Sequence, residues 1–473
     1  MTDLCYASAR DLAAMIAARS VSSAEVLEAH LDRVRRDNPH VNAICTLVEE
    51  PARAAARRAD DLAARGEPLG PLHGLPIVIK DLVPTAGIRT TWGSRIYADV
   101  VPTEDAVSVE RIKRAGAIII GKSNTPELGA GSQTFNEVFG ETRNPYDTTR
   151  TCGGSSGGSA VALACGMVPL ADGTDMGGSL RNPASFCNVV GFRPSIGRVP
   201  EWPARSAWHT LSVPGPMGRS AADVAWLLAV MAGPDPRAPL SIDESGDRFR
   251  GDLRRAFRGT RVAWSATLGR YPVERVVRDV CAAAAASLGD LGCEVDAADP
   301  DVSGADEIFQ TLRAASFAGA YADDLERHRD LMKDTVIWNV ERGLALSARD
   351  VARAETARTA LYHRVRTFLE RYEFLVLPTV QVAPFPIEER WVASIDGVEL
   401  RTYIDWMATC YVITLTGLPA VSVPAGFTPG GLPVGLQIVG RHHRDFDVLQ
   451  LANAFELATG HGRRRPAPFL DLP

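Results

Sequence analysis

The chain reads Cys-Gly-Gly-Ser-Ser-Gly-Gly-Ser at residues 152–159 and Gly-Thr-Asp-Met-Gly-Gly-Ser-Leu-Arg-Asn at residues 173–182. Each stretch is a glycine-rich turn that presents a serine, Ser155 in the first turn and Ser179 in the second. Glycine lets the backbone adopt positive φ, so that several N–H groups can turn toward one point. Such N–H groups beside a serine hydroxyl can stabilise an oxyanion next to a nucleophile. The pattern therefore predicts a site built around a nucleophilic serine.

Other interpretations of the first turn explain less of the sequence. A flexible linker is disfavoured because six apolar residues, 160–165, follow at once and end at Gly166, which predicts a short buried helix with a glycine cap. A phosphate loop is disfavoured because G-x-x-x-x-G-K-[ST] is absent and no strand with G-x-G-x-x-G frames the turn. Residues 153–157 also match the G-x-S-x-G elbow of α/β-hydrolases, but that pattern leaves the second turn unexplained.

Taken together, the two turns resemble the signature of the amidase signature family of serine hydrolases. The family pattern is a Gly-Gly-Ser-Ser-Gly-Gly turn, a short helix, and then Gly-Thr-Asp-x-Gly-Gly-Ser-x-Arg, and this chain keeps both halves and the spacing between the serines. Upstream, residues 74–81 read Gly-Leu-Pro-Ile-Val-Ile-Lys-Asp, which resembles the family segment that carries a catalytic lysine. Without the resemblance, Lys80 would be interpreted as the solvated end of an apolar strand.

The resemblance implies a Ser-Ser-Lys triad. Ser179 attacks the carbonyl, Lys80 is the base, and Ser155 relays the proton between them. Ser155 is expected to form a cis peptide bond with Ser156 or with its other neighbour. No histidine lies in either serine motif, His73 being the nearest in the sequence, and serine–lysine variants of the triad are known. A neutral lysine near pH 7.5 requires a pKa about three units below its usual ~10.4, which burial behind an apolar strand can supply.

The resemblance also implies supporting groups around the triad. The N–H groups of the second turn form the oxyanion hole, the loop after the strand at 117–120 faces the substrate, and three further side chains orient the turns. Lys122, a second lysine at the end of that strand, is interpreted as structural. The N–H groups of the oxyanion hole are those of Met176, Gly177, Gly178 and Ser179. The residues that face the substrate are Gly129, Ala130, Gly131 and Ser132. The side chains that orient the turns are Asp175, Arg181 and Ser156, with Arg181 bracing the loop through Asp175.

Composition points to a soluble enzyme without a cofactor. The formal net charge of −6 argues against nucleic-acid or anionic-membrane partners. The eight cysteines show no C-x-x-C spacing, which predicts reduced thiols in the cytoplasm, and no ligand spacing indicates a metal. Residues 1–20 lack a secretory pattern and no apolar run approaches the ~20 residues of a membrane span. Members of the family often form dimers, so the resemblance implies a homodimer.

The predicted fold class is α/β, with one large domain over residues 1–473 and a mixed, mostly parallel sheet flanked by helices. Landmarks of the family run from residue 74 to residue 440, which favours one continuous domain although the length alone would suggest about three. Residues 1–68 are predicted to form an N-terminal helical segment. Residues 300–372 are almost entirely helical in pattern and are predicted to wall the pocket.

The predicted function is hydrolysis of a C–N bond in a small carboxamide, anilide or carbamate by a stand-alone amidase. One alternative is the glutaminase subunit of a tRNA-dependent amidotransferase. It is disfavoured because Thr414 stands where relatives usually place Asn, and because Tyr-Ile-Asp-Trp at 403–406 resembles stand-alone amidases. Another is an α/β-hydrolase esterase that uses Ser155. A hydrophobic pocket is expected from aromatic and apolar residues: Trp202, Trp208, Met332 and Trp338.

Overall fold

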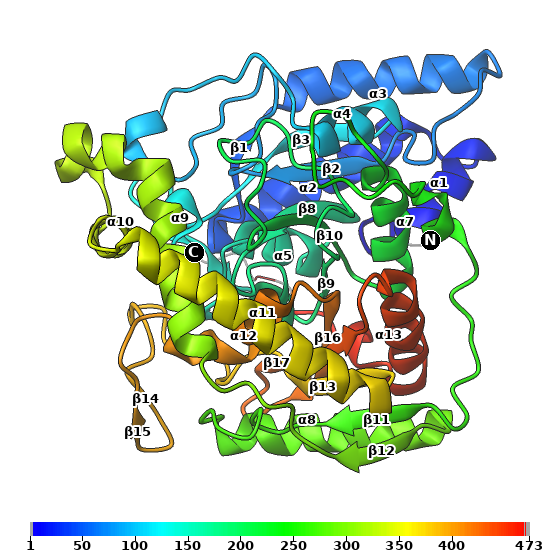
Figure 1. Ribbon diagram of the computed structural model, residues 1–473. Coiled ribbons are helices and arrows are strands. Elements are labelled where there is room, and N and C mark those ends of the chain that lie inside the picture. Colours follow the sequence, from blue (N-terminus) through cyan, green and yellow to red (C-terminus); the bar gives the residue numbers. More distant parts are fainter. Residues whose placement is uncertain (1–2, 468, 470–473) are drawn as a thin grey trace.

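A computed structural model describes residues 3–467 and 469 (Figure 1). Within this part of the chain, eleven strands form one sheet in the order β1-β3-β2-β8-β10-β9-β16-β17-β13-β11-β12. Their bounds are β1 (Ile44–Leu47), β2 (Pro76–Lys80), β3 (Ile118–Ser123), β8 (Leu170–Asp175), β9 (Val190–Arg193), β10 (Val213–Gly218), β11 (Arg261–Trp264), β12 (Glu294–Ala297), β13 (Phe374–Pro378), β16 (Ala420–Phe427) and β17 (Pro433–Gly440).

The sheet is mixed, as predicted, but the expectation that parallel pairs predominate is wrong. Strands β3-β2-β8 at one end and β13-β11-β12 at the other pair in parallel. The strands between them, from β8 through β10, β9, β16 and β17 to β13, pair antiparallel, and so does β1 with β3. Parallel neighbours need a long crossover, whereas β16 and β17 are joined by the short hairpin connection 428–432.

Helices cover both faces of the sheet and create two cores. One face carries α5 (Gly157–Ala164), α11 (Ala348–Arg371) and α12 (Ala408–Thr416), and the other carries α7 (Ala221–Met231), α8 (Arg275–Ala286) and α13 (Asp445–Thr459). Side chains of β2 alternate between the cores, because Val78 joins the first while Ile77 and Ile79 join the second. Lys80, two residues beyond Val78, therefore lies on the face that α5 covers.

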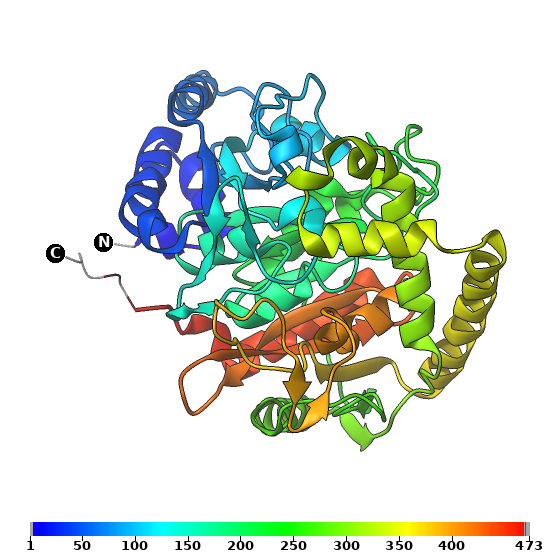
Figure 2. The same cartoon turned by 90° about the vertical axis from the view of Figure 1, so that its left-hand side faces the viewer.

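Two further groups of helices surround the sheet. The N-terminal helices are α1 (Ala9–Ala17), α2 (Ser23–Val41) and α3 (Glu49–Ala64), and α9 (Ala305–His328) and α10 (Asp334–Leu344) precede α11. Figure 2 shows the N-terminal helices on one side of the molecule and α9–α11 on the other. α2 and α11 each begin with a capping box, at Ser22–Glu25 and Ser347–Asp350. No helix in residues 3–467 is long and apolar enough to cross a membrane.

Candidate active site

Lys80 and the first serine turn meet beneath the N-terminal end of α5. Lys80 ends β2 and is completely buried, and Ser155 and Ser156 immediately precede α5. The peptide bond between Gly154 and Ser155 is cis, on the side of Ser155 away from Ser156. The Lys80 ammonium donates to Ser155 Oγ at 2.7 Å and to Ser156 Oγ at 2.9 Å. The structure thus joins a lysine and two serines that are distant in the sequence.

Thr174 completes the surroundings of the lysine and was not predicted from the sequence. Its Oγ1 accepts a hydrogen bond from Lys80 Nζ at 3.0 Å. The three hydroxyls therefore use all three donors of the ammonium. Because β8 lies next to β2 in the sheet, Thr174, near the end of β8, comes close to the end of β2. The signal that could have identified it is its place in the Gly-Thr-Asp part of the second turn.

The second turn is held against the first by its backbone and by a buried ion pair. The N–H of Ser156 donates to the carbonyl of Ser179 at 3.1 Å. Arg181 pairs with Asp175 through two hydrogen bonds of 2.9 Å, and both side chains are fully buried. Arg193 also lies 3.3 Å from the Asp175 carboxylate. The predicted bracing contact between Arg181 and Asp175 is therefore present.

The N–H groups of the second turn have different partners. Asp175 accepts hydrogen bonds from the N–H of Gly178 at 2.9 Å and of Leu180 at 3.1 Å. The N–H of Gly178 is therefore engaged within the turn, and the expectation that it donates to an oxyanion needs correction. Within the described residues, the N–H groups of Met176, Gly177 and Ser179 have no acceptor.

Burial sets the protonation of the lysine. It lowers the pKa of Lys80 to about 7, although the charges of Asp172 and Asp175 act in the opposite direction. The backbone N–H of Lys80 donates to Asp172 Oδ1 at 2.7 Å, while Asp172 Oδ2 is buried without a partner in the described structure. Burial raises the pKa of Asp172 to about 6. Burial would also raise the pKa of Asp175, but the charges of Arg181 and Arg193 outweigh it and leave that pKa well below its usual range.

The predicted substrate loop lies between Ser155 and a cavity. A Cβ added at Gly129 would lie 3.7 Å from Ser155 Oγ, so the backbone there faces the serine. Gly131 and Ser132 line a cavity of about 240 Å³. Ser132 also supports the first turn, because its hydroxyl donates to the carbonyl of Gly154 at 2.5 Å. The cavity's aromatic and apolar walls are Phe135, Met332, Trp391, Tyr403 and Trp406.

Of the four residues expected to wall the pocket, only Met332 lines this cavity. Trp338 lines a neighbouring depression, and its ring packs edge-on against Tyr403. Trp202 lies beneath the guanidinium of Arg237, and Trp208 is 71% exposed, so neither forms a wall. Aromatic residues in loops carry no periodicity that would reveal which of them face inward.

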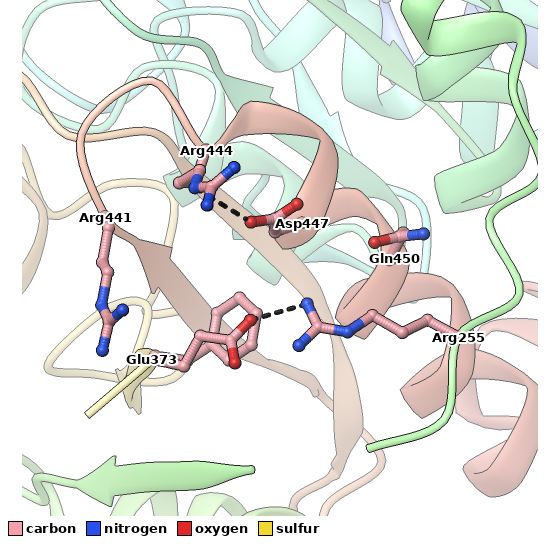
Figure 3. A pocket seen from close by; sticks show the side chains of 7 residues that line it. Arg255, Glu373, Arg441, Arg444, Asp447 and Gln450 are labelled. Atoms are coloured by element: carbon pink, nitrogen blue, oxygen red, sulfur yellow. Dashed lines mark ion pairs between the residues drawn. The ribbon is translucent and has the colours of Figure 1, made fainter. Parts of the chain in front are cut away.

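A larger cavity, of about 440 Å³, lies at the start of β13 and α13 (Figure 3). Its charged side chains pair with one another, as Figure 3 shows: Arg255 with Glu373 at 2.6 Å and Arg444 with Asp447 at 3.4 Å. Arg441 donates to backbone carbonyls at the end of α11. The cavity contains no residue of the lysine–serine cluster, and these contacts give it a structural role.

Two polar residues outside the cluster also have clear structural roles. Lys122 is buried, and its ammonium donates to the carbonyl of Val83 and to Thr85 Oγ1, which braces the loop after β2. His73 Nε2 contacts the carbonyl of Ala59 at 3.0 Å, so it is not aimed at Ser155. Residues 3–467 contain no group of three or more His, Cys, Asp or Glu side chains arranged to hold a metal ion.

Comparisons with known proteins identify the family of this chain. The family profile described as Amidase matches residues 25–449. An acylamidase of Rhodococcus erythropolis is 37% identical over 471 residues, covering 99% of this chain and 98% of that protein. The glutamyl-tRNA(Gln) amidotransferase A subunit of Moorella thermoacetica is 35% identical over 489 residues, covering 98% of this chain and 99% of that protein. The crystal structure of a bacterial aryl acylamidase of the amidase signature family superimposes with a TM-score of 0.91 at 29% identity, covering 96% of each chain. The chain belongs to the amidase signature family and is an amidase.

Proposed function

We propose that this amidase cleaves its substrate through an acyl-enzyme on Ser179, with Lys80 as the base and Ser155 as the proton relay. The observation that carries the proposal is the buried Lys80 Nζ, 2.7 Å from Ser155 Oγ. A serine hydroxyl is a weak nucleophile and needs an adjacent base. Burial lowers the pKa of Lys80 to about 7, so a large fraction of the amine is neutral near neutral pH.

The relay follows from the contacts of the lysine. When Lys80 is neutral, one of the three neighbouring hydroxyls donates a hydrogen bond to the nitrogen lone pair instead of accepting one. Ser155 Oγ, at 2.7 Å, is the closest of the three. The Ser155 oxygen is then free to accept the proton of Ser179 as Ser179 attacks the carbonyl. The ammonium of Lys80 later returns the proton through Ser155 to the leaving amine. Water then attacks the acyl-enzyme with the same proton transfers, which releases the acid and free Ser179.

The oxyanion of the tetrahedral intermediate is proposed to bind the N–H groups of Met176, Gly177 and Ser179. These N–H groups lack acceptors within the described residues, unlike that of Gly178. Removing one such donor from an oxyanion hole typically lowers kcat by about 10²–10³. Asp175 is proposed to hold the turn in this shape through Gly178 and Leu180.

The proposed substrate is a small carboxamide, anilide or carbamate. The aromatic wall made by Phe135, Tyr403 and Trp406 supports an apolar or aryl group next to the scissile bond. The names of the acylamidase and the aryl acylamidase among its relatives favour the same class. Cytoplasmic location, a homodimeric state and a mechanism without a cofactor remain predictions.

Of the two alternative functions, the glutaminase is tested in the same experiment and the esterase is weighed against the fold. The similarity to the amidotransferase polypeptide of Moorella thermoacetica keeps a glutaminase in consideration. In this chain, however, Thr414 is occupied in accepting a hydrogen bond from Arg181 at 3.0 Å. The α/β-hydrolase alternative, an esterase that uses Ser155, is disfavoured because the chain has the amidase signature fold and Ser155 contacts a lysine.

The first experiment measures amine release by the purified protein on an acyl anilide, a primary amide, an aryl carbamate and glutamine. Ser179→Ala and Lys80→Ala are each expected to lower kcat by about 10³ or more, and the double variant by little more than either, because the residues act as a unit. Ser206→Ala, at an exposed serine outside the site, is the matched control.

Each outcome discriminates between the assignments. Aryl amine released by the wild type but not by Ser179→Ala supports the stand-alone amidase. Ammonia from glutamine alone would favour the glutaminase of an amidotransferase. A Lys80→Ala variant within tenfold of the wild type would overturn the assignment of the base.

A further inference from the structure

The cavity next to the serines contains a cation that the proposed mechanism does not use. Lys333 immediately precedes α10 and lines the cavity together with Gly131, Phe135 and Trp406. A Cβ added at Gly131 would lie 4.0 Å from Lys333 Nζ. Only Ala130 separates Gly131 from Gly129, which faces Ser155, and two successive residue steps span at most about 7 Å. The ammonium therefore lies within reach of a small substrate bound at the serines.

The contacts of Lys333 leave hydrogen-bonding capacity free. Its Nζ donates to the carbonyl of Ala130 at 3.2 Å and lies 4.0 Å from the centre of the Phe135 ring. That carbonyl is its only hydrogen-bond acceptor among the described residues, whereas an ammonium has three donors. Burial lowers the pKa of Lys333 to about 8, partly offset by the charge of Glu127, so the charged form prevails at neutral pH.

A second cation lies at the same ring. The Arg390 guanidinium is 4.3 Å from the centre of Phe135 and lines the cavity as well. Within residues 3–467, neither Arg390 nor the Lys333 ammonium has a carboxylate at ion-pairing distance. Arg390 is exposed to solvent, where an arginine without a partner is ordinary, so the less exposed Lys333 ammonium, with its single carbonyl acceptor, is the cation that calls for an explanation.

The acidic groups near the cavity form no ion pair with these two cations within the described residues. Glu127 accepts hydrogen bonds from Ser94 Oγ and from the backbone N–H of Lys333, both at 2.7 Å. Glu137 lines the cavity but pairs with Arg95 at 3.0 Å. Asp334 lines it too and is exposed to solvent in the first turn of α10. The Lys333 ammonium thus remains available to a ligand.

We propose that the substrate is an amide that carries a carboxylate several bonds from the scissile C–N bond, and that Lys333, assisted by Arg390, binds this carboxylate. This inference rests on the proposed function of the same site. The aromatic walls of the cavity hold the apolar or aryl spacer between the two polar ends of the substrate. A charged group bound by an ammonium and a guanidinium also fixes the register of the amide relative to Ser179.

The test compares two substrates of equal length, the mono-4-nitroanilide of glutaric acid and its methyl ester. The quantity measured is the ratio of kcat/KM for the acid to kcat/KM for the ester. Lys333→Met, which keeps the side-chain length without the charge, is expected to lower this ratio at least tenfold, mainly through KM. Lys333→Arg, which keeps the positive charge, is expected to retain most of the wild-type ratio. Arg353→Met, at an exposed residue of α11, is the control for loss of net charge.

A ratio that does not change in Lys333→Met would overturn the inference, since a merely structural lysine would affect both substrates alike. Binding provides a readout that is independent of catalysis. In Ser179→Ala protein, glutarate mono-4-nitroanilide is expected to bind at least tenfold more tightly than its ester by calorimetry, and Lys333→Met should abolish the difference. Binding without hydrolysis in the wild type would refute the proposed function but not this inference, and equal binding of acid and ester would refute this inference alone.

Discussion

The pH dependence of kcat/KM follows from the burial of Lys80. Moving the pKa of this amine from 10.5 to about 7 corresponds to about 5 kcal/mol against the charged form. With a pKa of about 7, roughly nine tenths of the lysine is neutral at pH 8 and roughly one tenth at pH 6. With an ordinary pKa, only about one molecule in 300 would be neutral at pH 8. Since the proposed base is the neutral form of Lys80, kcat/KM should be level above pH 8 and fall about tenfold per pH unit well below pH 7.

Asp172→Asn is the perturbation that tests this cause. The charge of Asp172 raises the pKa of Lys80, and an amide at this position keeps an acceptor for the Lys80 N–H. The variant should therefore show a lower pKa for Lys80, and the acidic limb of its profile should move to lower pH. Rates on an acyl anilide are measured from about pH 5.5 to about pH 9, with kcat/KM fitted to one ionisation. Asp32→Asn, at an exposed carboxylate of α2, is the control.

Two results would refute the reasoning. A wild-type profile that is flat down to pH 5.5 would mean that no group with the pKa of Lys80 limits the reaction. An acidic limb that moves to higher pH in Asp172→Asn would contradict the sign of the electrostatic coupling. Circular dichroism of each variant at the extremes of pH separates a change in ionisation from loss of the fold.

Three further perturbations have defined outcomes. Arg181→Met leaves Asp175 buried without its main partner, so the free energy of unfolding should fall by about 3–5 kcal/mol in denaturant titrations; an unchanged midpoint would contradict this. Gly158→Ala should prevent folding into active protein, because its Cβ would lie 2.3 Å from a backbone nitrogen, whereas the exposed Gly289→Ala meets nothing within 4 Å and should express normally. Thr174→Val removes one of three partners of the Lys80 ammonium and should lower kcat about tenfold, in line with a hydrogen bond to a charged group; full activity would show that the hydroxyl is dispensable.

The residues of the proposed triad could be located from the sequence because local patterns mark them. Glycine turns around Ser155 and Ser179 and an apolar strand that ends in Lys80 are visible without any tertiary contact. Helix starts at Ser22 and Ser347 were predictable for the same reason, since a capping box involves only neighbouring residues.

Features that depend on tertiary packing could not be predicted in this way. Strand β8 contains a glycine and β10 contains both glycines and prolines, and neither shows alternation, so both are specified by their neighbours in the sheet. The same holds for α12, which is buried on all sides and therefore shows no helical periodicity. The engagement of the Gly178 N–H by Asp175 depends on a turn geometry that no spacing reveals.

The proposed catalytic groups and one part of the cavity wall belong to different parts of the architecture. Lys80, Ser155 and Ser179 lie on the sheet and on turns packed against it, whereas Lys333 precedes α10, and Arg390, Trp391 and Tyr403 flank the hairpin of β14 (Ser394–Ile395) and β15 (Val398–Glu399). Figure 1 shows this hairpin projecting from the body of the molecule. The proposed selectivity is thus partly separable from bond cleavage: the segments around α10 and the hairpin are where homologues, or a recombined library, are expected to vary while the lysine–serine cluster stays constant.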